Sequence, residues 1–424
     1  MIVVIRTLFI AVLFCTLSLA PIIAGMTTGE VKRFQDFKTN AKDGDRIAQY
    51  SLGVCYANGL GVAKDEAEAV SWYRKAAGLG VPDAQYNLGW CYSNGFGVGR
   101  DESEAVSWYR KAAAQEYAAA EYVLGNYYAN GLGVDKDYVQ AVSWYRKAAS
   151  HGIASAKYSL GVCYAEGLGV TKDLVVAITW YREAAAQGDV DALYNLGVHY
   201  SNGAGVSKDE VQAVLWYRKA ADRGDAKGQY NLGVNYANGL GVTKNDTEAV
   251  LWYRKAANQG YALAQNNLGF CYANGFGVTK DEAEAMSWYR KAAAQGDANA
   301  LNNLGFCYSN GLCVAKDEAE AVSWYRKAAE QGDAKGQYNL GVCYANGLGV
   351  SKDEIEAYAF YNIAGVTYED ARKNLALLEE TMSPDARLVG QRRTKQLQKE
   401  IGGRLESAQE LLKAIEMEKL RKGA

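Results

Sequence analysis

A tryptophan recurs every 36 residues through most of this chain, and this spacing constrains the fold more than any other feature. No insertion or deletion interrupts the series, which reads Trp72, Trp108, Trp144, Trp180, Trp216, Trp252, Trp288, Trp324 and, in the ninth place, Phe360. A constant period of about 20 to 50 residues is typical of stacked structural units that contact mainly their neighbours. The sequence therefore predicts one repeat array rather than the several globular domains that 424 residues would otherwise suggest.

Each repeat contains the pattern of two short helices. In the first repeat, Ala48, Leu52 and Tyr56 recur every four residues, which places them along one stripe of a helix. Gly59 follows this stripe, where a left-handed glycine can close the last turn. Asp65 then precedes the second apolar stripe, where its carboxylate can accept from the free N–H groups of the first turn. The repeat is thus predicted to be a helical hairpin joined by a short glycine loop.

Three further features of the repeat carry structural predictions. Glu68 lies three residues after Asp65, a spacing typical of a capping box. Gly53 interrupts the first helix in every copy, although a helical glycine costs about 1 kcal/mol relative to alanine. We therefore expect a neighbouring helix to approach it closely. Trp72 and Tyr73 fall on the apolar face of the second helix, and we interpret the tryptophans as core residues.

Taken together, these motifs closely resemble the Sel1-like repeat, a relative of the tetratricopeptide repeat. Small departures occur at Glu116, Cys313 and Phe360, which replace a leading glycine, a loop glycine and the last tryptophan. The resemblance implies an all-α fold, an α-solenoid forming a right-handed superhelix of nine 36-residue helix-turn-helix repeats. It also implies a scaffold or adaptor, of a kind that bacteria often export. The expected repeats are residues 44–79, 80–115, 116–151, 152–187, 188–223, 224–259, 260–295, 296–331 and 332–367.

The two ends of the chain differ from the repeats. Residues 1–25 hold an uncharged apolar run after Arg6 and end in small residues, which predicts a signal peptide or, alternatively, an N-terminal membrane anchor. Residues 26–43 are expected to form an N-terminal capping helix. Residues 368–424 are expected to form C-terminal capping and polar helices, with a break at Gly402 and Gly403. The repeats should accordingly lie in an extracytoplasmic space, periplasmic or secreted, or be membrane-anchored there.

Six cysteines occupy one column of the array: Cys55, Cys91, Cys163, Cys271, Cys307 and Cys343. Equivalent Cα atoms of stacked hairpins should lie about 10 Å apart, because helices pack at roughly that distance. A disulfide needs a separation of about 4.4–6.8 Å. We therefore expect these thiols to stay unpaired, and Cys307 with Cys313 is the only pair within one repeat.

By the same resemblance, the first helices line the concave surface of the superhelix. Positions 51 and 55 of each repeat then predict a polar floor of amides and thiols for a bound peptide, because asparagine both donates and accepts hydrogen bonds. A solvated face, or amides that cap neighbouring turns, is the alternative interpretation. The candidate partner-binding residues are Asn87, Tyr127, Asn195, His199, Asn231, Asn235, Asn267, Asn303 and Asn339.

Little in the sequence points to chemistry. Only two histidines, His151 and His199, are present, and they lie too far apart in sequence for a familiar zinc motif. No acid, base and nucleophile form a cluster unique to one repeat. With 46 basic and 48 acidic residues, the chain has no charge excess that favours a nucleic acid. We therefore expect no metal, cofactor or catalytic residue, and no membrane contact except through an uncleaved leader.

The predicted function is non-catalytic binding of a protein or peptide partner. The alternative is a cell-envelope protein that binds or processes glycans, with a tyrosine column as the binding surface: Tyr50, Tyr86, Tyr158, Tyr194, Tyr230 and Tyr338. The sequence leaves the oligomeric state and the identity of the partner open.

Overall fold

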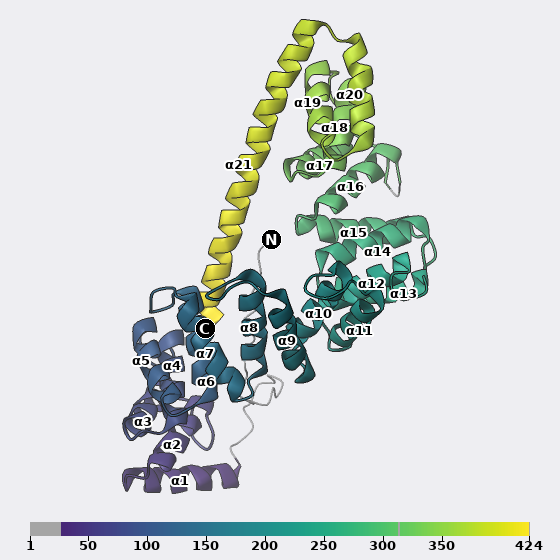
Figure 1. Cartoon of the computed structure of the whole chain (residues 1–424). Coiled ribbons are helices and arrows are strands. Elements are labelled where there is room, and N and C mark those ends of the chain that lie inside the picture. Colours follow the sequence, from purple (N-terminus) through teal and green to yellow (C-terminus); the bar gives the residue numbers. More distant parts are fainter. Residues whose placement is uncertain (1–26, 313, 424) are drawn as a thin grey trace. The chain divides into compact units, whose positions relative to one another are not determined.

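All regular secondary structure is helical in the part that the computed structural model describes, residues 27–312 and 314–423. The expected signal peptide or anchor lies outside these residues. Figure 1 shows the helices in chain order. Their bounds are α1 Thr28–Lys42, α2 Arg46–Asn58, α3 Glu66–Gly78, α4 Pro82–Asn94, α5 Glu102–Ala113, α6 Ala118–Asn130, α7 Tyr138–Ser150, α8 Ala154–Glu166, α9 Leu174–Ala186, α10 Val190–Asn202, α11 Glu210–Asp222, α12 Ala226–Asn238, α13 Asp246–Asn258, α14 Ala262–Asn274, α15 Glu282–Ala294, α16 Ala298–Asn310, α17 Glu318–Glu330, α18 Ala334–Asn346, α19 Glu354–Ala364, α20 Glu369–Thr381 and α21 Pro384–Gly423.

The chain divides into two compact units. The first contains α1 to α9 and most of α10, and the second contains α11 to α20 and most of α21. Within each unit, the two helices of a repeat pack against each other and against the adjacent repeats, as an α-solenoid requires. Among the described residues, no helix combines the length and apolar character needed to cross a membrane.

The loops follow the predicted capping chemistry, with one difference. Gly59 is left-handed, with φ of 71°, and Asp65 accepts from the backbone N–H of Glu68 at 3.0 Å. The reciprocal half of the expected capping box is replaced, because the backbone N–H of Asp65 donates to the carbonyl of Tyr56 at 2.9 Å. That bond ties the start of the second helix to the end of the first. It fixes the angle at which the hairpin closes.

The expected close approach at the helical glycines is confirmed. A Cβ built on Gly53 would lie 2.6 Å from Cδ1 of Tyr73, on the second helix of the same hairpin. Leu52 is completely buried beside this contact, and Tyr73 is 4% exposed. The tyrosine that follows each tryptophan therefore forms the centre of the core.

The tryptophans lie at the edge of the core rather than at its centre. Trp252 is 6% exposed, but the others are half-buried, Trp72 and Trp216 among them. The Lys75 ammonium stands 3.7 Å from the centroid of the Trp72 ring, and the same cation–π contact recurs in most repeats. The predicted core assignment is thus corrected to a boundary position, where one ring face packs inward and a lysine covers the other.

Polar side chains link successive repeats. Arg74 donates to the hydroxyl of Tyr92 in the next repeat at 3.1 Å, and equivalent pairs recur along the array. Gln85 donates to the carbonyl of Ala77 at 3.2 Å and accepts from Gln115 at 2.8 Å. These bonds satisfy the end of a second helix and set the register of the following repeat.

The C-terminal helix α21 runs through the glycine pair at which a break was predicted. Arg393 pairs with Glu356 at 2.6 Å and Arg404 pairs with Glu330 at 2.6 Å, one on each side of Gly402 and Gly403. Each helical glycine costs about 1 kcal/mol, and contacts on both sides of the pair offset that preference. Tertiary packing therefore overrides the local signal for a helix end.

Candidate partner-binding surface

The Cys55 column, which recurs every 36 residues from Cys55, lies in the core rather than on the surface. Tyr127 is 3% exposed and donates to Ser93 at 2.5 Å, and Asn235 is 4% exposed. Asn235 donates to the carbonyl of Leu240 at 2.9 Å, and a ring nitrogen of the half-buried His199 lies 2.8 Å from the carbonyl of Ala204. Asn235 and His199 thus fasten the loop of their own hairpin, whereas Tyr127 contacts the preceding repeat. The burial of this column favours the alternative interpretation, in which its side chains fasten neighbouring turns, and partner binding by Tyr127, His199 and Asn235 remains a prediction.

The thiols of the same column are buried and unreactive. The six that the structure describes are free and buried, as expected; Cys313 lies outside the described residues. Burial raises the pKa of Cys91 to about 12 and that of Cys271 to about 11. Thiols with such pKa values stay protonated near neutral pH and are poor nucleophiles or metal ligands.

The Ser51 column, which holds most of the predicted asparagines, is half-buried and largely engaged within the array. Two of its amides donate to a tyrosine hydroxyl of the preceding repeat: Asn87 to Tyr50 at 3.4 Å, and Asn195 to Tyr158 at 3.2 Å. Asn303 contacts Asn266 at 2.9 Å, Asn339 contacts Asn302 at 2.8 Å, and Asn231 donates to the carbonyl of Lys227 at 3.1 Å. Asn267 accepts from Asn266 at 3.4 Å. These amides bind neighbouring first helices together or cap a turn. Binding of a partner by this column remains a prediction.

Two other columns on the first helices hold exposed side chains. The Val54 column holds three exposed aromatic residues, Trp90, Phe270 and Phe306, which are 40%, 48% and 51% exposed. Sequence reasoning missed it, although positions 51, 54 and 58 are three and four residues apart and so share one helix face. Position 55 is adjacent in sequence but turned about 100° away, toward the core.

The Asn58 column lies beside these aromatic residues; its members are amides except Glu166, and all but the half-buried Asn94 and Asn130 are exposed. Asn238 and Asn274 donate to the carbonyl four residues earlier, at 2.9 and 2.8 Å. The side-chain oxygen of such an amide can still accept from a partner's backbone N–H. The described members are Asn58, Asn94, Asn130, Glu166, Asn202, Asn238, Asn274, Asn310 and Asn346.

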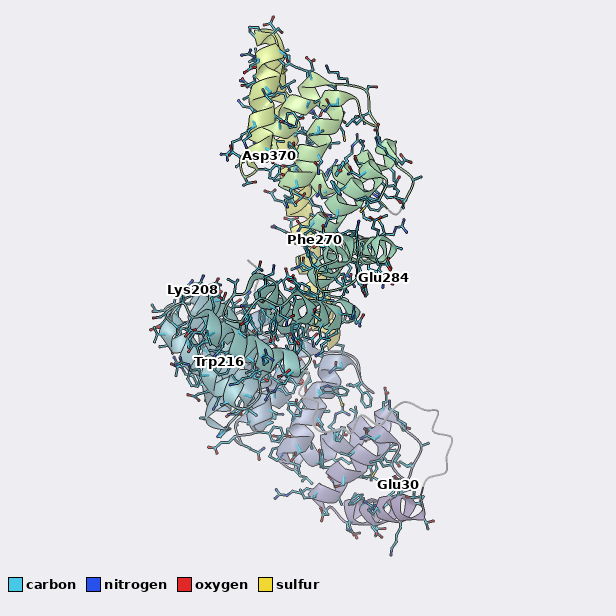
Figure 2. All side chains as sticks on the ribbon, turned by 90° about the vertical axis from the view of Figure 1, so that its right-hand side faces the viewer. Glu30, Lys208, Trp216, Phe270, Glu284 and Asp370 are labelled. Carbon is cyan, nitrogen blue, oxygen red and sulfur yellow. The ribbon has the colours of Figure 1, made fainter. Side chains whose placement is uncertain are left out.

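A groove of 310 Å³ opens on this face in the second unit, between α12 and α14. Phe270 and Phe276 form one wall, with ring centroids 5.8 Å apart, and Asn238 and Asn267 line it as well. Figure 2 labels Phe270 among the side chains of the second unit. The groove thus joins an apolar wall to amide groups that can bond a peptide backbone.

Charge and reactivity in the groove are low. Its lining cation, Lys244, lies 3.7 Å from Asp246, so the two charges offset each other. Burial raises the pKa of the Tyr253 hydroxyl, which stays protonated near neutral pH. Among the described residues, no group of histidine, cysteine and carboxylate side chains could hold a metal ion. The geometry favours non-covalent binding.

Comparison with known proteins gives the family. The model of the Sel1 repeat matches nine consecutive segments of the chain: residues 46–81, 82–117, 118–153, 154–189, 190–225, 226–261, 262–297, 298–333 and 334–365. The chain belongs to the Sel1 repeat family. These segments have the predicted period and begin two residues later than the expected bounds. The all-α solenoid of nine Sel1 repeats is thereby confirmed.

Two solved Sel1 repeat structures resemble the chain. One is c5321, a protective antigen of uropathogenic Escherichia coli strains with an SLR fold, at 33% identity and a TM-score of 0.52 over 89% of this chain and 97% of that one. The other is a Sel1 repeat protein from Oxalobacter formigenes, at 32% identity and a TM-score of 0.56 over 73% of this chain and 89% of that one. No curated protein shows a sequence match. Sel1 and tetratricopeptide-like repeat proteins generally mediate protein–protein interaction.

Proposed function

We propose that this Sel1 repeat protein is a non-catalytic scaffold or adaptor that binds a protein or peptide partner through the exposed face of its first helices. The observation that carries the proposal is the groove between α12 and α14, where Phe270 and Phe276 stand beside the amides of Asn238 and Asn267. Apolar surface next to hydrogen-bonding groups is characteristic of sites that take up a peptide.

Two properties of the array support a binding role over catalysis. The thiols and phenols that come closest to the groove are protonated near neutral pH, because burial raises the pKa values of Cys271 and Tyr253. Catalysis also needs a preorganised group of acid, base or nucleophile, and a surface repeated every 36 residues supplies the same side chains many times over.

The glycan alternative gains no specific support. The tyrosines proposed for it pack against other tyrosines inside the array: the rings of Tyr50 and Tyr73 lie 6.0 Å apart, and those of Tyr158 and Tyr181 lie 5.8 Å apart. Rings engaged in this way offer little free face for a sugar.

We further propose that the protein acts outside the cytoplasm, in the cell envelope or after secretion. The apolar leader supports this location, and so does the similarity to a protein that is described as a protective antigen. Proximity labelling in the native cell, with the label fused to the C-terminus, tests partner and compartment together. Recovery of one envelope or secreted protein is expected, and recovery of cytoplasmic proteins alone would contradict the proposed location.

A further inference from the structure

The aromatic pair at the groove is a local departure from an otherwise regular surface. Positions 54 and 60 of the repeats usually hold aliphatic residues, such as Val234 and Leu240 in the sixth repeat. In the seventh repeat they are Phe270 and Phe276, which remain 48% and 46% exposed. Exposed aromatic side chains that touch each other in a hollow are unfavourable in water and typical of a surface that is covered by a ligand.

The same pair occurs once more, in the second repeat. Trp90 and Phe96 occupy the equivalent positions, with ring centroids 5.3 Å apart, and the Lys64 ammonium lies 5.1 Å from the Phe96 centroid. Lys244 holds the place of Lys64 in the groove of the second unit. Two copies of one arrangement, one in each unit, indicate a built feature of the array rather than a single irregularity.

The groove's size and charge restrict what can fill it. A volume of 310 Å³ is at the lower limit for ligand pockets, enough for one large side chain and its adjoining backbone. Lys244 and Asp246 offset each other at 3.7 Å, so the lining attracts neither an anionic nor a cationic anchor. A charged side chain placed there would lose hydration without gaining a counter-ion.

We propose that the groove between α12 and α14 is an anchor site for an extended, uncharged peptide segment that inserts one aromatic side chain against Phe270 and Phe276. The amides of Asn238 and Asn267 bond the backbone of the segment on either side of the anchor. This inference rests on the proposed scaffold function and adds the chemistry of the partner. The Trp90 and Phe96 pair in the first unit takes a segment of the same kind.

The test uses the full chain and four capped heptapeptides, Ser-Gln-Ser-X-Ser-Gln-Ser with X as Phe, Ala, Glu or Lys, in titrations followed by saturation-transfer NMR. The Phe peptide should bind about tenfold or more tightly than the Ala peptide, because burial of one aromatic side chain corresponds to that ratio. The Glu and Lys peptides should bind no better than the Ala peptide. Equal binding of a charged peptide, or no binding of the Phe peptide, would overturn the proposal.

Variants taken from the chain's own repeats locate the site. Phe270→Val with Phe276→Leu restores the residues of the sixth repeat and should reduce the preference for Phe, while Trp90→Val with Phe96→Leu should remove what remains. The matched control is Leu251→Ser, which removes a 43% exposed apolar side chain from α13 and introduces the serine found at Ser71. An unchanged Phe preference in the quadruple variant would refute the assignment, as would an equal loss in the control.

Self-association is distinguished from peptide binding by sedimentation velocity on the same proteins. A wild-type dimer that the groove variants abolish would show that a second copy of the chain occupies the groove, against the proposal. Partner capture from the native cell separates the proposed scaffold function from the proposed peptide site in the groove. A quadruple variant that still captures the partner leaves the scaffold function in place and removes the groove's role; absence of any partner, even with the wild-type chain, removes the scaffold function itself.

Discussion

The ring of Tyr145 lies against Gly125 so closely that a Cβ built on the glycine would stand 2.4 Å from Cδ1 of the ring. This contact joins α6 to α7, and the tyrosine is only 2% exposed. Because the ring is enclosed on all sides, it has no space into which it can withdraw. The two helices can therefore pack this closely only because position 125 is glycine.

Replacement of this glycine by alanine should destabilise the first unit. Overpacking a closed core costs about 1–3 kcal/mol, which exceeds the gain of about 1 kcal/mol from the better helix propensity of alanine. The control is Gly402→Ala, where nothing lies within 4 Å of the added Cβ and a small stabilisation is expected. Hydrogen exchange of the α6 and α7 amides measures the first effect, and protection equal to wild type would contradict it.

Adjacent aromatic residues in α11 should differ in their contribution to stability. Tyr217 is 4% exposed, whereas Trp216 is half-buried with the Lys219 ammonium 4.1 Å from its ring centroid. Tyr217→Ala should cost about 4–5 kcal/mol and Trp216→Ala about 2–3 kcal/mol, since the cost follows the buried volume that is lost. Limited proteolysis around α11 and urea unfolding give the order; a larger loss at the tryptophan would place it at the centre of the core after all.

Asp189, the N-cap of α10, should make stability depend on pH. Burial raises the pKa of its carboxyl from the ordinary 3.8 to about 6 in the folded chain. Between about pH 4 and pH 6 the folded state therefore binds more protons than the unfolded state, and the free energy of unfolding falls as the pH rises through this window. The loss is complete by about pH 7, at about 2–3 kcal/mol.

Asp189→Asn should flatten this dependence. Asparagine caps a helix as well as aspartate does, but it carries no charge to desolvate. The variant should be more stable than wild type at pH 8 and similar to it at pH 4, as measured by hydrogen exchange of α10 at the two pH values. The control is Asp45→Asn at the exposed N-cap of α2, which measures the effect of replacing aspartate by asparagine where the carboxyl is not buried. A variant whose stability follows that of wild type between pH 4 and pH 6 would show that another group is responsible.

The repeat period predicted the array, and several of its local features could be predicted because one residue decides each of them. Gly59 ends α2 because only glycine adopts its φ of 71° without strain, and Asp65 caps α3 through its own side chain. The sequence could not predict that Trp216 is less buried than Tyr217, because both side chains fall within the apolar sector of the helix. The direction in which the Asn235 side chain points could not be predicted for a related reason. Neighbouring positions of a helix point about 100° apart, and only the packed hairpin shows which of them faces the core. At Gly402, helix propensity alone predicts a helix end, but the ion pairs made by Arg393 and Arg404 stabilise a continuous helix.

Two asparagines of α12 provide the sharpest comparison between a structural and a binding amide. Asn235 is buried and donates to the Leu240 carbonyl, whereas Asn238 is exposed and lines the groove. Asn235→Ala removes a buried amide and leaves the Leu240 carbonyl without its donor, and it should destabilise the second unit by about 1–3 kcal/mol. Asn238→Ala should change the free energy of unfolding by less than about 0.5 kcal/mol, as surface substitutions usually do, but should weaken capture of the partner. Urea unfolding and quantitative pull-down on the same preparations separate the two effects. If Asn235→Ala kept wild-type stability and lost the partner, the column predicted from the sequence would be the binding surface, and the groove face would not.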